Sequence, residues 1–536
     1  MSAAEAETWD AIVVGGGIAG LAAAWELTRA GLRPLLVEAR GYTGGLVAGA
    51  RIAGVRMDLG AEGFVLRGRA VSEAAEALGL EVVGPSGGRA RLLLPPLPDD
   101  DDGATDPGRP GHRGHHGTAD PDGPWRLHRI PRDCLLGIPA DPTAPDVVEI
   151  LGEAGAQRAA ADVDLPGRAG TGPDAAADLA SFITARMGPA VLDRLVRPIV
   201  AGIHAADPGA LAADTVAPGL REATARLGSL RAAVGELLRR RRARWGRRSM
   251  DATTRGGLVR LTDALRDAIE ADGGSVRTRT GAQSLRPAGS AGDGAARWEL
   301  TLAPTGRGPT PSDEPVSVGP AQRVRTDRLI LACSAGPARR LLAGAGVETD
   351  LSAPVGSPIA RFMLVVRAPG LAGAPVGSGL LVAPPAPGRR APVRAKALSH
   401  LSVKWPWIGR ELRARHGEDV HALRLSYGRP GEPRPEVALG DALADVEALT
   451  GVRIAPDDVV DHMLVRWDGT LPPVDAAYRE RAAALVERAE SLPGLGLTGA
   501  WVAGTGIAAV VEHARSRAGR LAGGAGDDAD RTGRRS

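Results

Sequence analysis

The segment from Asp10 to Glu38 constrains the fold more than any other part of the 536-residue chain. It runs from an apolar stretch through the motif Gly15-x-Gly17-x-x-Gly20 into an amphipathic stretch, and a second apolar stretch ends at Glu38. A strand, a glycine-rich turn, a helix and a second strand form a βαβ unit with parallel strands. The glycines allow a tight turn and the approach of a pyrophosphate, while an acid at this distance accepts hydrogen bonds from ribose hydroxyls. The segment predicts a dinucleotide-binding α/β domain.

Composition excludes several classes of protein. Hydrophobic residues make up 43% of the chain and charged residues 24%, which is typical of a globular protein and not of a disordered one. The formal net charge of +3 gives nucleic-acid binding little support. The two cysteines, Cys134 and Cys333, stand outside any CxxC motif, which fits a reducing compartment. Because the sequence has no apolar run of membrane-spanning length and no signal-peptide pattern, we expect a cytoplasmic protein without a transmembrane segment.

The residues after Glu38 favour FAD over NAD. Glu38-Ala39-Arg40 leads into the pair Gly44-Gly45, and a short apolar segment then leads into Asp58-Leu59-Gly60-Ala61-Glu62. A glycine pair lets this loop lie against the phosphates of a cofactor, and NAD dehydrogenases do not usually carry one directly after the ribose-binding acid. In these features the chain resembles the FAD-dependent amine oxidase and protoporphyrinogen oxidase superfamily.

Further segments narrow this resemblance to one branch. They are Leu195–Asp207, Arg255–Leu258, Ser402–Pro406, Arg466-Trp467 with Leu471-Pro472, and Gly499–Gly506. Together they resemble the oxygen-dependent coproporphyrinogen III oxidases of the Gram-positive and actinobacterial type. The resemblance implies an FAD oxidase that converts coproporphyrinogen III to coproporphyrin III in haem biosynthesis, with O2 as electron acceptor and H2O2 as product. It implies a porphyrinogen and O2 as small-molecule partners, with a further haem-pathway enzyme as a candidate protein partner.

The resemblance also assigns site residues. Those expected to contact FAD are Gly15, Gly16, Gly17, Ile18, Ala19, Gly20, Glu38, Ala39, Gly44, Gly45, Leu46, Gly60, Ala61, Glu62, Gly63, Ala282, Trp467, Gly504, Thr505 and Gly506. No catalytic residue is assigned, and His204 is the single candidate, with packing as the alternative explanation. The chain departs from the branch at Ala508, where proline is common, and at Val510, where a small polar residue or cysteine is common.

The expected architecture is α/β, with a discontinuous Rossmann-like FAD-binding domain, an α-helical insertion and a mixed-sheet α+β substrate domain. The FAD-binding domain is expected to draw on three segments, 1–90, 251–300 and 495–521. The helical domain is expected at 146–250, and the substrate side at 91–145 and 324–494. Their Gly, Pro and polar content predicts flexible segments at 98–123, 301–323 and 522–536.

Alternative interpretations remain open from the sequence. The rival functions are a protoporphyrinogen IX oxidase, a flavin amine oxidase or desaturase, and a non-catalytic FAD- or porphyrin-binding module. Amine oxidases favour an aromatic cage, which 3 Phe, 3 Tyr and 9 Trp can hardly supply. His112, His115 and His116 are interpreted as a solvated loop and not a metal site, so no metal is expected. The Trp405-Pro406-Trp407 segment fits a substrate platform or the core, and Arg239–Arg242 fits a solvated helix end or weak contact with an anionic membrane surface.

Overall fold

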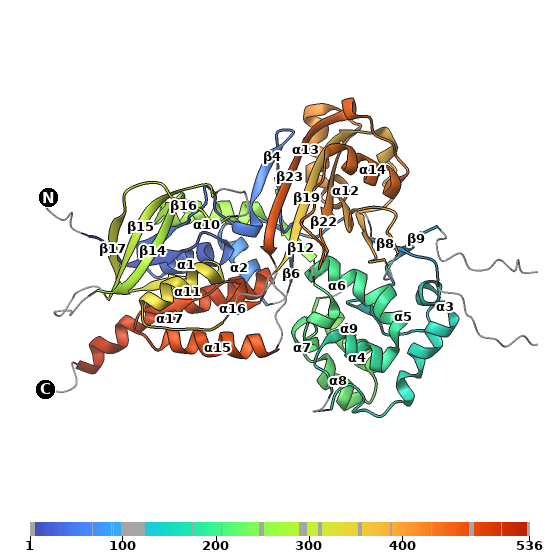
Figure 1. Ribbon diagram of the computed structural model, residues 1–536, viewed down its shortest axis with the longest axis horizontal. Coiled ribbons are helices and arrows are strands. Elements are labelled where there is room, and N and C mark those ends of the chain that lie inside the picture. The colour runs from blue at the N-terminus through green and yellow to red at the C-terminus, as the bar shows by residue number, and fades with distance from the viewer. Residues whose placement is uncertain are drawn as a thin grey trace, which may run out of the picture.

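The computed structural model shows two main sheets and a helical unit (Figure 1). It describes residues 6–66, 68–86, 88, 90–97, 124–172, 175–204, 206–245, 251–288, 297–308, 313–351, 356–385, 389–429, 431–470, 476–504 and 506–532. The segment 98–123, with its three histidines, lies outside these residues, as does Thr505. For His204 only the backbone is described. Within the described ranges, no helix has the length and apolar character that crossing a membrane requires, and no group of His, Cys, Asp and Glu side chains could hold a metal ion.

The first main sheet holds five parallel strands drawn from distant parts of the chain. Its order is β13-β3-β2-β18-β24, with bounds Ser275–Arg277, Pro34–Val37, Ala11–Val14, Leu329–Leu331 and Leu495–Leu497. Four of the five strands, β3, β2, β18 and β24, are buried along their whole length. Burial on both faces explains why they are continuous apolar runs in the sequence. The predicted discontinuous Rossmann-like architecture is confirmed.

Two layers cover this sheet. Ile12 and Val14 pack into one core cluster and Ala11 and Val13 into another, because alternate side chains of a strand point to opposite faces. Three helices lie on the second of these faces, namely α1 (Ile18–Arg29), α10 (Val259–Ala271) and α17 (Ile507–Thr532). The other face packs against two helices and a further, mixed sheet in which only β1 and β17 pair in parallel: α11 (Ala335–Gly344), α15 (Ala476–Glu490), β1 (Glu7–Trp9), β14 (Thr280–Pro287), β15 (Trp298–Gly306), β16 (Val316–Ser317) and β17 (Gln322–Thr326).

The second main sheet is mixed and has seven strands. Its order is β23-β19-β22-β21-β20-β8-β9, with bounds Val459–Thr470, Ser357–Arg367, Val420–Tyr427, Ala397–His400, Gly379–Val382, Arg91–Leu94 and Arg126–Arg129. Only β20 and β8 pair in parallel. Helix α14 (Leu439–Thr450) packs on one face, and helices α12 (Leu401–Lys404) and α13 (Pro406–His416) cover part of the other. Trp405 and Trp407 are 2% and 7% exposed in this second core, so they are core residues.

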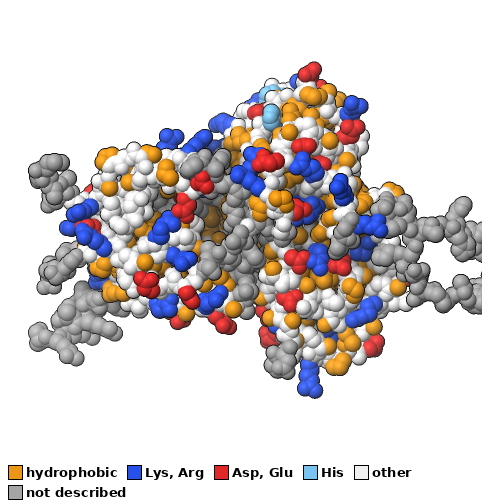
Figure 2. All heavy atoms as spheres, viewed as in Figure 1, with side chains coloured by type: hydrophobic (Ala, Val, Ile, Leu, Met, Phe, Trp, Pro, Cys, Tyr) orange, Lys and Arg blue, Asp and Glu red, His pale blue; other side chains and the backbone are white. Residues whose placement is uncertain are grey.

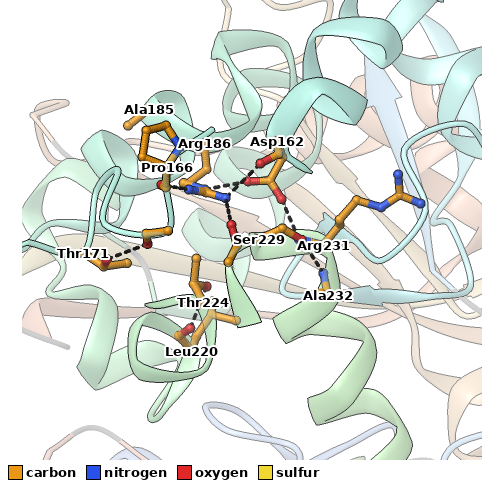
Figure 3. A network of polar contacts seen from close by, with 12 residues as sticks. Asp162, Pro166, Thr171, Ala185, Arg186, Leu220, Thr224, Ser229, Arg231 and Ala232 are labelled. Atoms are coloured by element: carbon orange, nitrogen blue, oxygen red, sulfur yellow. Dashed lines mark hydrogen bonds and ion pairs between the residues drawn. The ribbon is translucent and has the colours of Figure 1, made fainter. Parts of the chain in front are cut away.

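A helical unit packs beside the second sheet, as the green ribbons of Figure 1 show. Its helices are α3 (Pro145–Ala160), α4 (Leu179–Met187), α5 (Pro189–Val191), α6 (Arg197–His204), α7 (Ala213–Val216), α8 (Leu220–Leu227) and α9 (Leu230–Trp245), and a π-helical turn, Leu192–Val196, joins α5 to α6. A fully buried ion pair, Arg186 Nε to Asp162 Oδ1 at 2.5 Å, holds it together (Figure 3). The guanidinium also donates to the backbone oxygens of Asp162, Pro166 and Gly228, and Asp162 accepts the N–H of Arg231. Complete pairing is what allows two buried charges to remain there.

Short elements link these units. They are β4 (Gly49–Ile52), β5 (Val55–Asp58), β6 (Phe64–Val65), α2 (Ala70–Ala77), β7 (Val82–Val83), β10 (Cys134–Leu135), β11 (Ile138–Pro139), β12 (Asp251–Thr254) and α16 (Ala500–Ala503). Basic and acidic side chains are interspersed over the face shown in Figure 2. In the basic run on α9, Arg240 pairs with Glu236 and Arg242 with Asp133, which favours the solvated helix end.

The structure redraws several predicted segment boundaries. Strands β15, β16 and β17 lie within 301–323 and its flanks, where a flexible insertion was predicted. β17 is polar because three of its five side chains are exposed, so composition alone made it resemble a loop. β18, α11 and the residues up to Leu351 belong to the first sheet and its covering layer, so the substrate side begins after 351 and not at 324. Helix α15 packs in the same layer, so the substrate side ends before Ala476 and not at 494. Helix α17 continues to Thr532, past residue 521, where a disordered tail was expected.

Candidate active site

The turn between β2 and α1 leaves room for a ligand at one glycine and none at another. Gly15 has φ +111°, which favours glycine, and a Cβ on Gly20 would lie 1.8 Å from the Gly15 oxygen. A Cβ on Gly17 would meet nothing within 4 Å. Gly17 caps α1 without a side-chain hydrogen bond, and the first turn carries no acid. The first N–H groups of α1 therefore have no side-chain acceptor, which suits the pyrophosphate of a dinucleotide.

Glu38 is fixed directly beside this turn. Its carboxylate accepts the backbone N–H of Gly16 at 2.7 Å through Oε2 and that of Arg40 at 2.7 Å through Oε1. Burial raises the pKa of Glu38, while these two hydrogen bonds act in the opposite direction. A Cβ on Gly16 would lie 2.8 Å from that of Glu38, so only glycine fits there. The carboxylate is held at the carboxyl end of β3, where ligands of parallel sheets bind.

Two predicted loops run together next to the turn. Gly44 and Gly45 have φ of +96° and +58°, and the Gly44 N–H donates to the Gly16 oxygen at 2.8 Å. The Ala61 N–H donates to the Leu46 oxygen at 3.0 Å, and a Cβ on Gly60 would lie 2.0 Å from that oxygen. The backbone contact therefore brings the segment after Gly44 against the Gly60–Gly63 segment.

The second sheet meets the first unit at Gly60. A Cβ on Gly60 would lie 3.5 Å from Cη2 of Trp467, which stands on β23. Arg424 on β22 donates from Nη1 to the Gly60 oxygen at 3.1 Å. Gly63 is equally confined, because a Cβ there would lie 2.7 Å from the Ala252 oxygen. Trp467, predicted from the family resemblance, is thus brought to the same place as the glycine segment.

Glu62 joins the same junction through its side chain. Lys404 donates to its carboxylate, Arg424 Nη2 lies 3.3 Å from Oε1, and Trp405 Nε1 lies 3.5 Å from Oε2. Burial alone would raise the pKa of Glu62, but the charges of Arg424 and Lys404 outweigh it and lower the pKa to about 2. The ionised carboxylate is therefore engaged by the second sheet and α12, and it fastens the Gly60–Gly63 segment to them.

The remaining predicted positions are spread over three elements. Ala282 lies on β14, whose Thr280 N–H donates to the Glu38 oxygen at 2.9 Å, so β14 passes beside Glu38-Ala39. Gly504 and Gly506 precede α17, which begins at Ile507 and has no acid in its first turn. His204 is the last residue of α6, and nothing more is described of it.

The departure at Val510 has a structural explanation. Val510 is 4% exposed and packs in the core formed by α1, α10 and α17. Ala508 is partly buried against the same core. An apolar side chain at position 510 therefore contributes to holding α17 on the sheet.

Sequence reasoning missed three basic residues at this junction: Arg361, Arg424 and Lys396. Arginine gave no signal, because 66 residues are Lys or Arg and only two are lysine. Lysine could have indicated this junction from the sequence, because the chain contains only two lysines. Lys404 binds Glu62, and Lys396 lies near Arg361 and Arg429.

Comparison with known proteins places this site in a family. The model of the flavin-containing amine oxidoreductases matches residues 18–345, which is more than half of the chain. The chain belongs to this family. It is thus an oxidoreductase with a flavin-binding fold, and the predicted enzyme class is confirmed.

Relatives along nearly the whole chain carry a narrower name. "Coproporphyrinogen III oxidase" of Mycobacterium tuberculosis strain H37Rv is 27% identical over 510 residues, covering 93% of this chain and 94% of that protein. The protein of that name from Propionibacterium freudenreichii is 26% identical over 95% of this chain and 89% of its own length. A crystal structure assigned as a protoporphyrinogen oxidase from Exiguobacterium sp. 255-15 has a TM-score of 0.68 at 21% identity, covering 97% and 99% of the two chains. The resemblance predicted from the motifs is confirmed.

Proposed function

We propose that this protein is an FAD-dependent coproporphyrinogen III oxidase of haem biosynthesis. It converts coproporphyrinogen III to coproporphyrin III, and each two-electron step reduces one O2 to one H2O2. The observation that carries the proposal is the similarity to relatives of that name over about nine-tenths of the chain. The structure adds that the glycine-rich segments beside the predicted nucleotide turn meet a sheet with basic side chains at Gly60. The cofactor contacts predicted from the sequence belong to this proposal.

The residues at the turn fit FAD. The N–H groups at the start of α1 would hold the pyrophosphate, and Glu38 would receive the ribose hydroxyls. Gly44–Leu46 and Gly60–Gly63 would line the flavin, with the start of α17 facing its pyrimidine end and stabilising negative charge there. Bound FAD supplies the acceptor for the hydride that leaves a bridging carbon of the substrate. The chain's own residues orient the macrocycle and exclude water.

Charge at the junction favours a carboxylate-bearing substrate over an amine. Arg361 and Arg424 lie on the face of the second sheet that carries Trp467, as the strand register shows. A protonated amine would be repelled there, whereas the propionates of a porphyrinogen would be attracted. The other two nearby indoles, those of Trp405 and Trp407, are buried in the core, so they are not available to form an aromatic cage around the flavin. This observation separates the proposal from a flavin amine oxidase.

Anaerobic reduction of the purified yellow protein tests the proposal and separates it from a non-catalytic carrier. Coproporphyrinogen III is expected to bleach the flavin absorbance, and admission of air is expected to restore it with porphyrin fluorescence and H2O2. A primary amine such as putrescine serves as the control substrate and should leave the flavin oxidised. A protein that binds FAD but is not reduced by any porphyrinogen would refute the proposed activity.

A further inference from the structure

A row of five basic side chains crosses the second sheet from the Gly60–Gly63 segment outward. The five are Lys404, Arg424, Arg361, Lys396 and Arg429. Lys404 and Arg424 both act on Glu62, the charge of Arg424 acts on Arg361, and the charges of Arg361 and Arg429 act on Lys396. The two ends of the row are compensated. Glu62 pairs with Lys404 and Arg424, while Glu432 and Asp445 face Arg429.

In the middle of the row, Glu62 acts on Arg361 and Glu432 acts on Lys396, but no ion pair forms between these groups in the described part of the chain. Among the residues that the structure describes, no hydrogen bond or ion pair reaches the Arg361 side chain, and its electrostatic neighbours are Arg424 and Glu62. The Lys396 ammonium donates to the backbone oxygen of Gly428. Burial and the like charge of Arg424 lower the pKa of Arg361 to about 9. Burial, with the charges of Arg361 and Arg429, lowers the pKa of Lys396 to about 8. Two cations are held here at a cost that a bound anion would offset.

Strand register places Arg361 on the side of the candidate flavin site. On β19, Ile359 pairs with Trp467 and Met363 pairs with Arg424, and Arg361 lies between them on the same face. Trp467 and Arg424 both meet Gly60. The alternate residues of β19, including Phe362, face the opposite core.

Residue usage points to the same place independently. All but two of the 66 basic residues are arginine, and both lysines, Lys396 and Lys404, belong to this row. An ammonium is a compact point charge with three donors, whereas a guanidinium is a planar fork that binds a carboxylate through two parallel hydrogen bonds. Arg361 with Lys396 beside it thus offers both kinds of donor to one anion.

We propose that Arg361, with Lys396 beside it, receives a peripheral carboxylate of the substrate and so makes the site selective for polycarboxylate macrocycles. The inference rests on the proposed function for the macrocycle and names the residues that would recognise its charge. Coproporphyrinogen III carries four propionates, so it presents a carboxylate on every side of the ring. The tetramethyl ester keeps the same ring and the same carboxyl oxygens, adds one methyl group to each propionate and removes the negative charge.

The experiment compares acid and ester on the FAD-loaded enzyme. Arg361→Met and Arg361→Lys are measured beside Arg367→Met, a control at the exposed end of the same strand. Initial rates give KM for coproporphyrinogen III and for its tetramethyl ester in detergent. Fluorescence titration gives the affinity for coproporphyrin III and its ester without turnover. Flavin content and melting temperature are recorded for each variant.

Arg361→Met is expected to raise KM and Kd for the acid by about tenfold or more and to change the values for the ester by less than about twofold. Arg361→Lys should recover most of the affinity for the acid, and Arg367→Met should match the wild type. Because the substitution removes a repulsion with Arg424, the melting temperature should not fall.

The outcomes separate the two proposals. If Arg361→Met leaves KM and Kd for the acid unchanged while the wild type turns over normally, the proposed carboxylate site at Arg361 is overturned and the proposed oxidase activity stands. Equal losses for acid and ester together with a lower melting temperature would also overturn it, since they indicate a structural role. If the wild type oxidises neither porphyrinogen, the oxidase fails, and the titration with porphyrin still decides on Arg361.

Discussion

The clearest single-residue consequence concerns His400, which is fully buried, with Nε2 3.2 Å from Nδ1 of His421. Burial, reinforced by His421, lowers the pKa of His400 from 6.5 to about 4. Between these values the unfolded chain binds more protons than the folded one, so the free energy of unfolding should fall as pH drops from 6.5 to 4. At pH 4 the loss from this group should be on the order of 3 kcal/mol.

Urea unfolding of the wild type and of His400→Gln at several pH values between 4 and 7.5 measures this effect. The variant should show a flatter profile across that window, whereas His416→Gln, a histidine outside this pair, should keep the wild-type slope. Parallel profiles for the wild type and His400→Gln would contradict the assignment.

At the scale of an element, the turn between β2 and α1 assigns different tasks to its glycines. Gly20 is needed for packing, because a methyl group there would lie 1.8 Å from the Gly15 oxygen. Gly17 faces open space, so a methyl group there meets no protein atom within 4 Å and would project toward a ligand. Gly17→Ala should therefore fold with a melting temperature near that of the wild-type apoprotein and bind FAD at least about tenfold more weakly. Gly20→Ala should yield little folded protein.

Circular dichroism on the apoproteins and flavin titration distinguish these two effects. Gly504→Ala provides a comparison at the second predicted cofactor turn, where a Cβ also meets nothing but φ is +91°. Tight FAD binding by Gly17→Ala would show that the cofactor does not approach this turn.

For the whole molecule, we expect the meeting of the nucleotide-binding unit with a cationic sheet to determine substrate preference. Protoporphyrinogen IX replaces two of the propionates with vinyl groups, so it leaves more of the row of five basic side chains without a carboxylate partner. We expect kcat/KM to favour coproporphyrinogen III by at least about tenfold, which corresponds to about 1.4 kcal/mol. A competition assay that resolves the two porphyrin products measures the ratio. Equal use, or a preference for protoporphyrinogen, would make the protein a protoporphyrinogen oxidase with the same redox chemistry.

The sequence by itself determined the nucleotide-binding unit, because all of its parts are local. Gly15 to Gly20, Glu38 and the two buried strands lie within thirty residues, and their spacing reflects backbone geometry that a short segment specifies alone. The glycine segments at Gly44 and Gly60 were also recognisable, since Gly44 has a φ of +96° and a Cβ on Gly60 would lie 2.0 Å from the Leu46 oxygen. The strands β16 and β17 were not recognised, because most of their side chains are exposed and their polar composition resembles that of a loop.

Only the tertiary structure determined how the cations are arranged. Arg361, Arg424 and Lys396 stand on three neighbouring parts of one sheet, and Glu62 reaches Arg424 from more than three hundred residues away along the chain. In a chain so rich in arginine, no residue type marks a buried guanidinium in advance. Burial and pairing depend on which strands become neighbours, and long-range β pairing is a property of the folded chain that local spacing does not encode.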